Sequence, residues 1–119
     1  MIIKAEDNTR ASIRDVSGGK GELLRCAPIP RGEGQPGSPF LMVSRMTIQP
    51  GASLGFHAHT EDEEVYYVLS GEAEYVDHDG SATMIGPGDT TLCLKGQSHG
   101  VNNKSASEPF VFLAVIAKA

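Results

Sequence analysis

Residues 51–71 read GASLGFHAHTEDEEVYYVLSG, and this stretch decides the fold. Two histidines, His57 and His59, lie two residues apart and are followed by a short acidic run. Residues 64–69 are then rich in β-branched and aromatic residues, which favour a strand. Side chains at positions i and i+2 of a strand project to the same side. The stretch therefore predicts a strand, a turn and a second strand, with Glu64 alongside both imidazoles.

The rest of the chain reads as a succession of short strands. Turn residues, such as those at 79–80 and 86–89, recur roughly every ten residues, which is typical of an antiparallel barrel or sandwich. No internal repeat and no good helical stretch interrupts the pattern. We predict one all-β domain over residues 1–119. The clearest strands are expected at 40–48, 64–69, 72–76, 90–94, 99–102 and 110–116.

Two segments precede this core. Residues 1–26 predict a lead-in with short strands, and the glycines at 17–21 lack the phosphate-loop spacing, so they indicate a flexible turn. Residues 27–39 contain four of the seven prolines, which disfavours both a helix and a central strand. Two interpretations of this long loop stay open: a plain mobile segment, or a lid that borders the barrel mouth.

Composition excludes several classes of protein. The net charge is −5 and the basic residues are scattered singly, so neither a nucleic acid nor an anionic membrane surface is an expected partner. Cys26 and Cys93 are too few for a secreted disulfide framework. The first residues contain no apolar stretch typical of a signal peptide. We expect a soluble, cytoplasmic protein.

The histidines and one glutamate suggest a metal site. If barrel closure brings His99 to His57, His59 and Glu64, three imidazoles and one carboxylate surround a single point. That donor set suits a divalent transition metal such as Mn, Fe, Ni, Co, Zn or Cu. His78, beside the turn at 79–80, is more simply a solvated turn residue. The acidic residues 61–63 are likewise expected to form a solvated face.

Two motifs resemble those of the cupin superfamily. The first is Gly51-x5-His57-x-His59-x4-Glu64-x6-Gly71, and the second is Gly88-x5-Leu94-x-Gly96-x2-His99-x3-Asn103. Together they cover residues 51–103. One position departs from the family pattern, since Leu94 stands where cupins usually have proline.

The resemblance implies a double-stranded β-helix, or jelly-roll barrel, with a metal near its middle. It also implies the ligand roles of His57, His59, Glu64 and His99, and turn-forming roles for the motif glycines and Asn103. The leading hypothesis is a small metalloenzyme acting on a polar organic metabolite by dioxygenase or isomerase-type chemistry. The alternative is a non-catalytic, metal-dependent binding or sensor module, because a fold alone does not define a reaction.

Tyr66 is the candidate catalytic residue. It shares the alternation of Glu64, so its hydroxyl is placed to donate a hydrogen bond or a proton to a substrate at the metal. Core packing is the alternative role of this side chain. The pocket wall is expected to include Phe40, Met42, Met46 and Phe112.

The opposite face of the same strand predicts a homodimer. Val65, Tyr67 and Leu69 share that face, and residues 110–116 are apolar on both faces. A half-solvated antiparallel strand normally alternates apolar with polar residues. An exposed apolar patch of this kind favours an oligomer interface, and twofold dimers are the commonest form. In the alternative, a monomer, residues 1–26 cover the patch.

Overall fold

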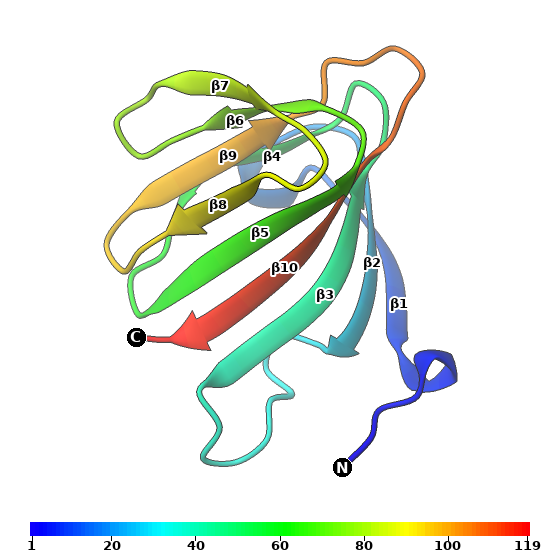
Figure 1. Cartoon of the computed structure of the whole chain (residues 1–119), viewed down its shortest axis with the longest axis vertical. Helices are drawn as coiled ribbons and strands as arrows, with labels where there is room; N and C mark the ends of the chain where they lie inside the picture. The colour runs from blue at the N-terminus through cyan, green and yellow to red at the C-terminus, as the bar shows by residue number, and fades with distance from the viewer.

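Ten strands form two antiparallel sheets in the computed structural model, which describes all of residues 1–119 (Figure 1). Two short 3-10 helices, η1 (Ala5–Asp7) and η2 (Val16–Gly18), accompany them. Neither is long and apolar enough to cross a membrane. In chain order the strands are β1 (Thr9–Arg14), β2 (Glu22–Ile29), β3 (Phe40–Ile48), β4 (Ser53–Ala58), β5 (Asp62–Ser70), β6 (Ala73–Val76), β7 (Ala82–Ile85), β8 (Thr90–Cys93), β9 (Ser98–Asn102) and β10 (Phe110–Lys118).

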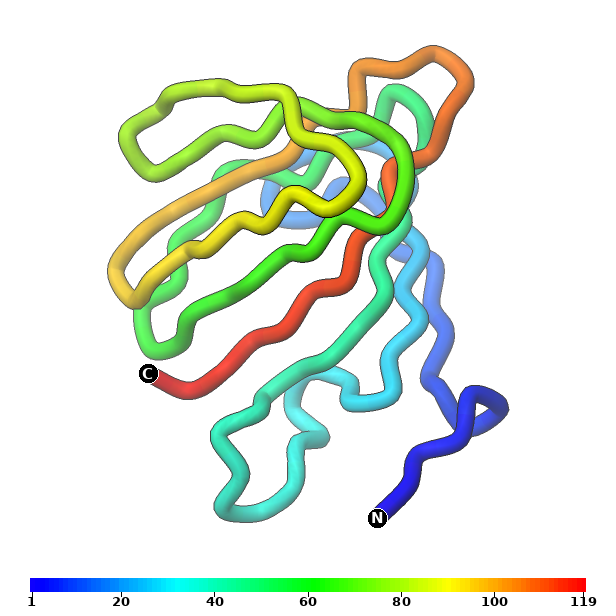
Figure 2. The backbone as a smooth tube through the Cα atoms, in the orientation of Figure 1, coloured from blue at the N-terminus to red at the C-terminus, as the bar shows by residue number.

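The strand order is that of a jelly roll. The larger sheet has the order β1-β2-β3-β10-β5-β8, and the smaller has the order β4-β9-β6-β7. The backbone trace shows the chain leaving one sheet for the other and returning (Figure 2). Strands β4 and β9 thus lie in the smaller sheet, whereas the strands before and after each of them lie in the larger sheet. This topology confirms the predicted all-β jelly-roll barrel. It also places strands from both motifs around one interior.

The core fills the space between the two sheets. On β3, Met42, Ser44, Met46 and Ile48 are buried, while the residues between them are more exposed. The same alternation on β5 buries Glu64, Tyr66 and Val68 and leaves Tyr67 and Leu69 each 46% exposed. Burying a large apolar side chain contributes about 1.5–3 kcal/mol. The inward row of β5 therefore carries Glu64 and Tyr66 into the interior between the two sheets.

The boundary between lead-in and loop was predicted wrongly. Residues 27–29 belong to β2, which lies between β1 and β3, although the four prolines of residues 27–39 argued against a central strand. The pairing of β2 with β3 shifts register between Cys26 and Ile29. Pro28 lies within this irregularity, where its missing N–H costs the ladder no regular bond. The connecting loop is thus residues 30–39.

The turn between β1 and β2 is packed against β4 rather than free. A side chain at Gly55 would meet the carbonyl oxygen of Ser17, and one at Gly19 would meet that of Ser53. Ser17 itself has a φ of 54°, in the left-handed region that non-glycine residues rarely adopt. The close approach of two backbones holds η2 on β4. It seats the tip of the N-terminal hairpin against β4, although Ser17 and Gly18 themselves stay exposed.

Leu94 keeps the second motif's turn without proline. Its N–H donates to the side-chain oxygen of Gln97 at 3.0 Å, and the N–H of Gln97 donates to the Leu94 carbonyl at 2.9 Å. Proline would lack the first of these donors. Asn103 closes the motif by donating to the carbonyls of Ile48, Gln49 and Glu108. Reciprocal hydrogen bonds thus fix the approach to His99.

Candidate metal centre

The structure brings the four predicted ligands together. His57 lies on β4 and pairs directly with His99 on β9, His59 follows the end of β4, and Glu64 lies on β5. One donor atom from each lies within 4.8 Å of the others. His59, Glu64 and His99 are buried, and His57 is partly exposed. The cluster therefore has one side open to solvent or to a ligand.

Three of the donor atoms are evenly spaced. Nε2 of His59 lies 3.1 Å from Nε2 of His99, and Oε1 of Glu64 lies 3.2 Å and 3.1 Å from these two nitrogens. An octahedral ion bonded at about 2.1 Å holds neighbouring ligand atoms about 3.0 Å apart. The spacing fits three ligands on one face of such an ion.

Each imidazole has its other nitrogen occupied. Nδ1 of His57 donates to the Gly55 carbonyl at 2.7 Å, and Nδ1 of His59 donates to the Asp62 carboxylate at 2.6 Å. Nδ1 of His99 lies 2.9 Å from the Tyr75 hydroxyl, which accepts in the tautomer that leaves Nε2 unprotonated. Three Nε2 lone pairs and a carboxylate then converge on one point. Such a donor set fits a divalent transition metal.

The acidic turn was misread from the sequence. Only Glu61 is exposed, whereas Asp62 is 5% exposed and begins β5. The second oxygen of Asp62 accepts from the guanidinium of Arg31 at 2.8 Å. Asp62, Glu64 and Tyr66 lie on the same face of β5. Extending the alternating strand pattern back to residue 62 would therefore have predicted that Asp62 points inward. Asp62 orients His59, and Arg31 ties the 30–39 loop to this contact.

The electrostatics of the cluster favour a bound positive charge. The hydrogen bond to Glu64 is the main cause that raises the pKa of His59. Burial acts to raise the pKa of Glu64, but its bonds to His59 and His99 outweigh burial and lower it to about 2. Burial lowers the pKa of His57. Glu64 is thus an anion at neutral pH. Its carboxylate faces the Nε2 atoms of His59 and His99, which are able to bind the same cation.

Tyr66 lies against the centre as well as in the core. It is 1% exposed, its ring stacks on His99, and its hydroxyl lies 3.3 Å from Nε2 of that histidine. Burial raises its pKa well above 10. The side chain therefore packs in the core and also contacts a candidate ligand, and its hydroxyl stays protonated at neutral pH.

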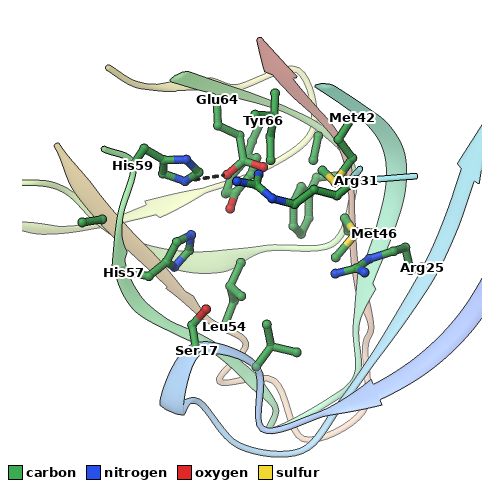
Figure 3. Close-up of a pocket in the computed structure, with 15 residues that line it drawn as sticks. Ser17, Arg25, Arg31, Met42, Met46, Leu54, His57, His59, Glu64 and Tyr66 are labelled. Carbon is green, nitrogen blue, oxygen red and sulfur yellow. Dashed lines mark ion pairs between the residues drawn. The ribbon is translucent and has the colours of Figure 1, made fainter. Parts of the chain in front are cut away.

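A cavity of about 230 Å³ opens beside the cluster (Figure 3). Met42, Met46 and Phe112 line it as expected, but Phe40 is half-exposed and lies outside it. Arg31 also lines the cavity, so the 30–39 loop borders the site. Ser17 and Arg25 of the N-terminal hairpin, which sequence reasoning did not single out, complete the wall. His78 is exposed and belongs to a turn on the smaller sheet.

The fold and the donor set together define the class of protein. Residues 44–116 match the cupin domain family, and the chain belongs to that family.

Two relatives and one solved structure are similar over most of the chain. An oxalate-binding protein of Thermotoga maritima is 34% identical over 98% of this chain and 93% of its own length. The crystal structure of a predicted oxalate decarboxylase from the same organism covers both chains fully at 30% identity, with a TM-score of 0.86. The dimethylsulfoniopropionate lyase DddQ of Ruegeria pomeroyi is 31% identical over 71% of this chain, which spans 41% of that enzyme.

Proposed function

We propose that this cupin binds a divalent transition metal through His57, His59, Glu64 and His99 and uses the ion to hold a small carboxylate anion. The convergence of three imidazoles and one carboxylate within 4.8 Å carries the proposal. Four protein ligands leave two positions open on an octahedral ion, enough for a chelating carboxylate. The similarity to an oxalate-binding protein supports the same ligand chemistry.

The cavity matches a small metabolite. Drug-sized ligands occupy pockets of about 300–1,000 Å³, and this cavity is smaller at about 230 Å³. Nine of its fifteen lining residues are hydrophobic, and its only polar groups apart from the cluster are Ser17, Arg25, Arg31 and the Tyr66 hydroxyl. An apolar wall with a few convergent polar groups is typical of a selective binding site. Arg25 favours an anion, because Arg31 is already paired with Asp62.

Calorimetric titration tests the proposal. We expect one equivalent of a carboxylate such as oxalate to bind the metal-loaded protein, and binding to disappear after chelation and dialysis. His57→Ala serves as the matched variant, since it removes one donor from the open side of the cluster. Equal affinity in the metal-loaded and metal-free proteins would contradict the proposal.

Catalysis is a second candidate, and Tyr66 is the observation that favours it. The bound metal would act as a Lewis acid towards an oxygen of the substrate. The Tyr66 hydroxyl lies 3.3 Å from Nε2 of His99, the nitrogen that faces His59 and Glu64, so it is placed to donate a hydrogen bond or a proton to that oxygen. Dioxygenase chemistry consumes O₂ and isomerase chemistry does not. Oxygen uptake with candidate acids therefore separates the two reactions.

We also propose a homodimer built on the outer face of the larger sheet. Tyr67 and Leu69 of β5 and Leu92 of β8 are each about half exposed there. Leu113 pairs with Tyr67 and extends the apolar surface onto β10. Strands β1 and β2 continue the sheet at its edge. They therefore leave this part of the face uncovered, and a second copy of the chain is the proposed cover.

A further inference from the structure

Arg25 is an inward-facing cation on an apolar surface. On β2, Leu23 and Ala27 are buried at 0% and 1% exposure, whereas Leu24 between them faces outward. Arg25 shares the inward alternation of Leu23 and Ala27, and it lines the cavity beside the metal cluster. Residues 22–29 lie outside the segment that matches the cupin family model. The position of this arginine is therefore a feature of the N-terminal hairpin.

The guanidinium of Arg25 has no partner within the protein. Its Nε is shielded from solvent and makes no hydrogen bond. None of the ion pairs of the structure includes it. By contrast, Arg31, the other arginine of the cavity, is paired with Asp62. A shielded donor on a charged group is costly unless a partner satisfies it, and an anion in the cavity would supply that partner.

Arg25 and the metal cluster lie on opposite sides of the cavity. Figure 3 shows the guanidinium pointing across the space towards the side that holds His57, His59 and Glu64. Met42 and Met46 line the cavity on the same side as Arg25, and Leu54 lies between Arg25 and His57 in this view. A ligand that engages both Arg25 and the metal cluster needs an acidic group at each end and an apolar middle.

The charges of the cavity also favour a ligand with two acidic groups. A divalent ion and Arg25 supply three positive charges, and Glu64 removes one. The pairing of Arg31 with Asp62 neutralises both of those residues. Two positive charges remain when the ion is bound, and these match a dianion.

We propose that the physiological ligand is a dicarboxylate longer than oxalate, with one carboxylate at the metal and the other held by Arg25. This inference rests on the proposed function, because it needs a metal ion bound by the four-residue cluster. Arginine presents a planar fork of donors that matches a carboxylate. The ligand's hydrocarbon middle lies against the apolar lining of Leu54, Met42 and Met46. Arg25 is then the residue that determines ligand length.

Calorimetric titration of the metal-loaded protein with matched acids tests the proposal. The probes are oxalate, succinate and glutarate, with butyrate and pentanoate as monocarboxylates of equal chain length. The variants are Arg25→Met and Arg25→Lys, and Arg45→Met is the matched control. Arg45 is an exposed arginine on β3 that pairs with Cys26 on the outward face. Metal content and melting temperature are measured for every variant.

The wild type should bind succinate or glutarate about tenfold or more tightly than the monocarboxylate of equal length, the size of one charged hydrogen-bonded contact. Arg25→Met should reduce this ratio to near one, with metal content unchanged and a melting temperature equal to or above that of the wild type. Arg25→Lys should give an intermediate ratio, and Arg45→Met should preserve it. Oxalate should lose much less affinity in Arg25→Met, because under the proposed function both of its carboxylates chelate the ion.

Two negative outcomes have separate meanings. An unchanged ratio in Arg25→Met, or a wild type that does not distinguish dicarboxylates from monocarboxylates, overturns the role of Arg25 and leaves metal-dependent carboxylate binding intact. If no acid binds better with metal than without it, the proposed function fails and this inference fails with it. A lowered melting temperature in both Arg25 variants would assign the arginine to folding and would also overturn the proposal.

Discussion

The Asp62 carboxylate accepts a hydrogen bond from Nδ1 of His59 at 2.6 Å. A carboxylate of this kind only accepts, so the contact fixes the tautomer of His59 and leaves Nε2 as the donor atom that faces Glu64 and His99. Asp62 is held in turn by Arg31. A residue of the acidic turn thus orients a candidate metal ligand without belonging to the candidate ligand set itself.

Asp62→Asn should weaken metal binding although it removes no ligand. The amide keeps the shape of the side chain, but it lacks the charge that orients and polarises His59. Loss of such a partner typically costs 10–100-fold in metal affinity. Competition with a chromogenic chelator measures the change. Glu61→Gln, at the exposed neighbouring position, is the control and should leave the affinity within about twofold.

Two tyrosines contact opposite nitrogens of His99. Replacing each with phenylalanine should therefore have different effects on metal affinity and on carboxylate binding. Tyr75 lies against Nδ1 and Tyr66 against Nε2. Tyr75→Phe removes the partner that sets the His99 tautomer, so metal affinity should fall by about tenfold or more. Tyr66→Phe should retain the metal and weaken carboxylate binding instead. Chelator competition and calorimetry on both variants check this, and identical profiles would contradict the assignment.

Gly55→Ala should destabilise the protein strongly. The added methyl group would collide with the carbonyl oxygen of Ser17, which is backbone and has no room to rotate away. We expect a loss of about 2 kcal/mol or more in the free energy of unfolding, measured by urea denaturation. Gly86→Ala is the control, since its nearest neighbour is a flexible carbon of Glu72 at 3.5 Å. Equal midpoints for the two variants would show that the hairpin is not seated on β4.

Tyr67→Glu should convert a dimer into a monomer. The variant places a charge at the centre of the proposed interface, where it would lose its water. Sedimentation equilibrium should give about twice 12.6 kDa for the wild type and a single chain for the variant. Phe56→Glu, at a 54% exposed position on the smaller sheet, should remain dimeric. A wild type that sediments as one chain at micromolar concentration rejects the interface.

Sequence periodicity predicted the strands that carry a clear alternating pattern. The boundaries of β3 match the expected 40–48, because its apolar and β-branched residues end at the turn after Ile48. The ligand set followed from spacing that matches a known family. Bringing His99 to His57 required β4 and β9 to pair, and that pairing is a long-range property of the closed barrel.

The packing of the N-terminal hairpin could not be predicted from the local sequence. Nothing in the periodicity of residues 1–26 indicated that η2 would rest on β4, since the contact depends on glycines in two distant segments. The placement of Ser17 and Arg25 in the cavity follows from that contact. The acidic turn failed for a different reason. Its three carboxylates look alike in sequence, and only the strand's true start at Asp62 shows which one turns inward.

Elemental analysis of the purified protein tests the central claim most directly. Inductively coupled plasma mass spectrometry should find about one divalent transition-metal ion per chain in the wild type, and far less in His57→Ala and His99→Ala at equal folded fraction by circular dichroism. His78→Ala, which changes an exposed histidine of a turn, should keep the full content. Equal, substoichiometric metal in all four proteins would contradict the account.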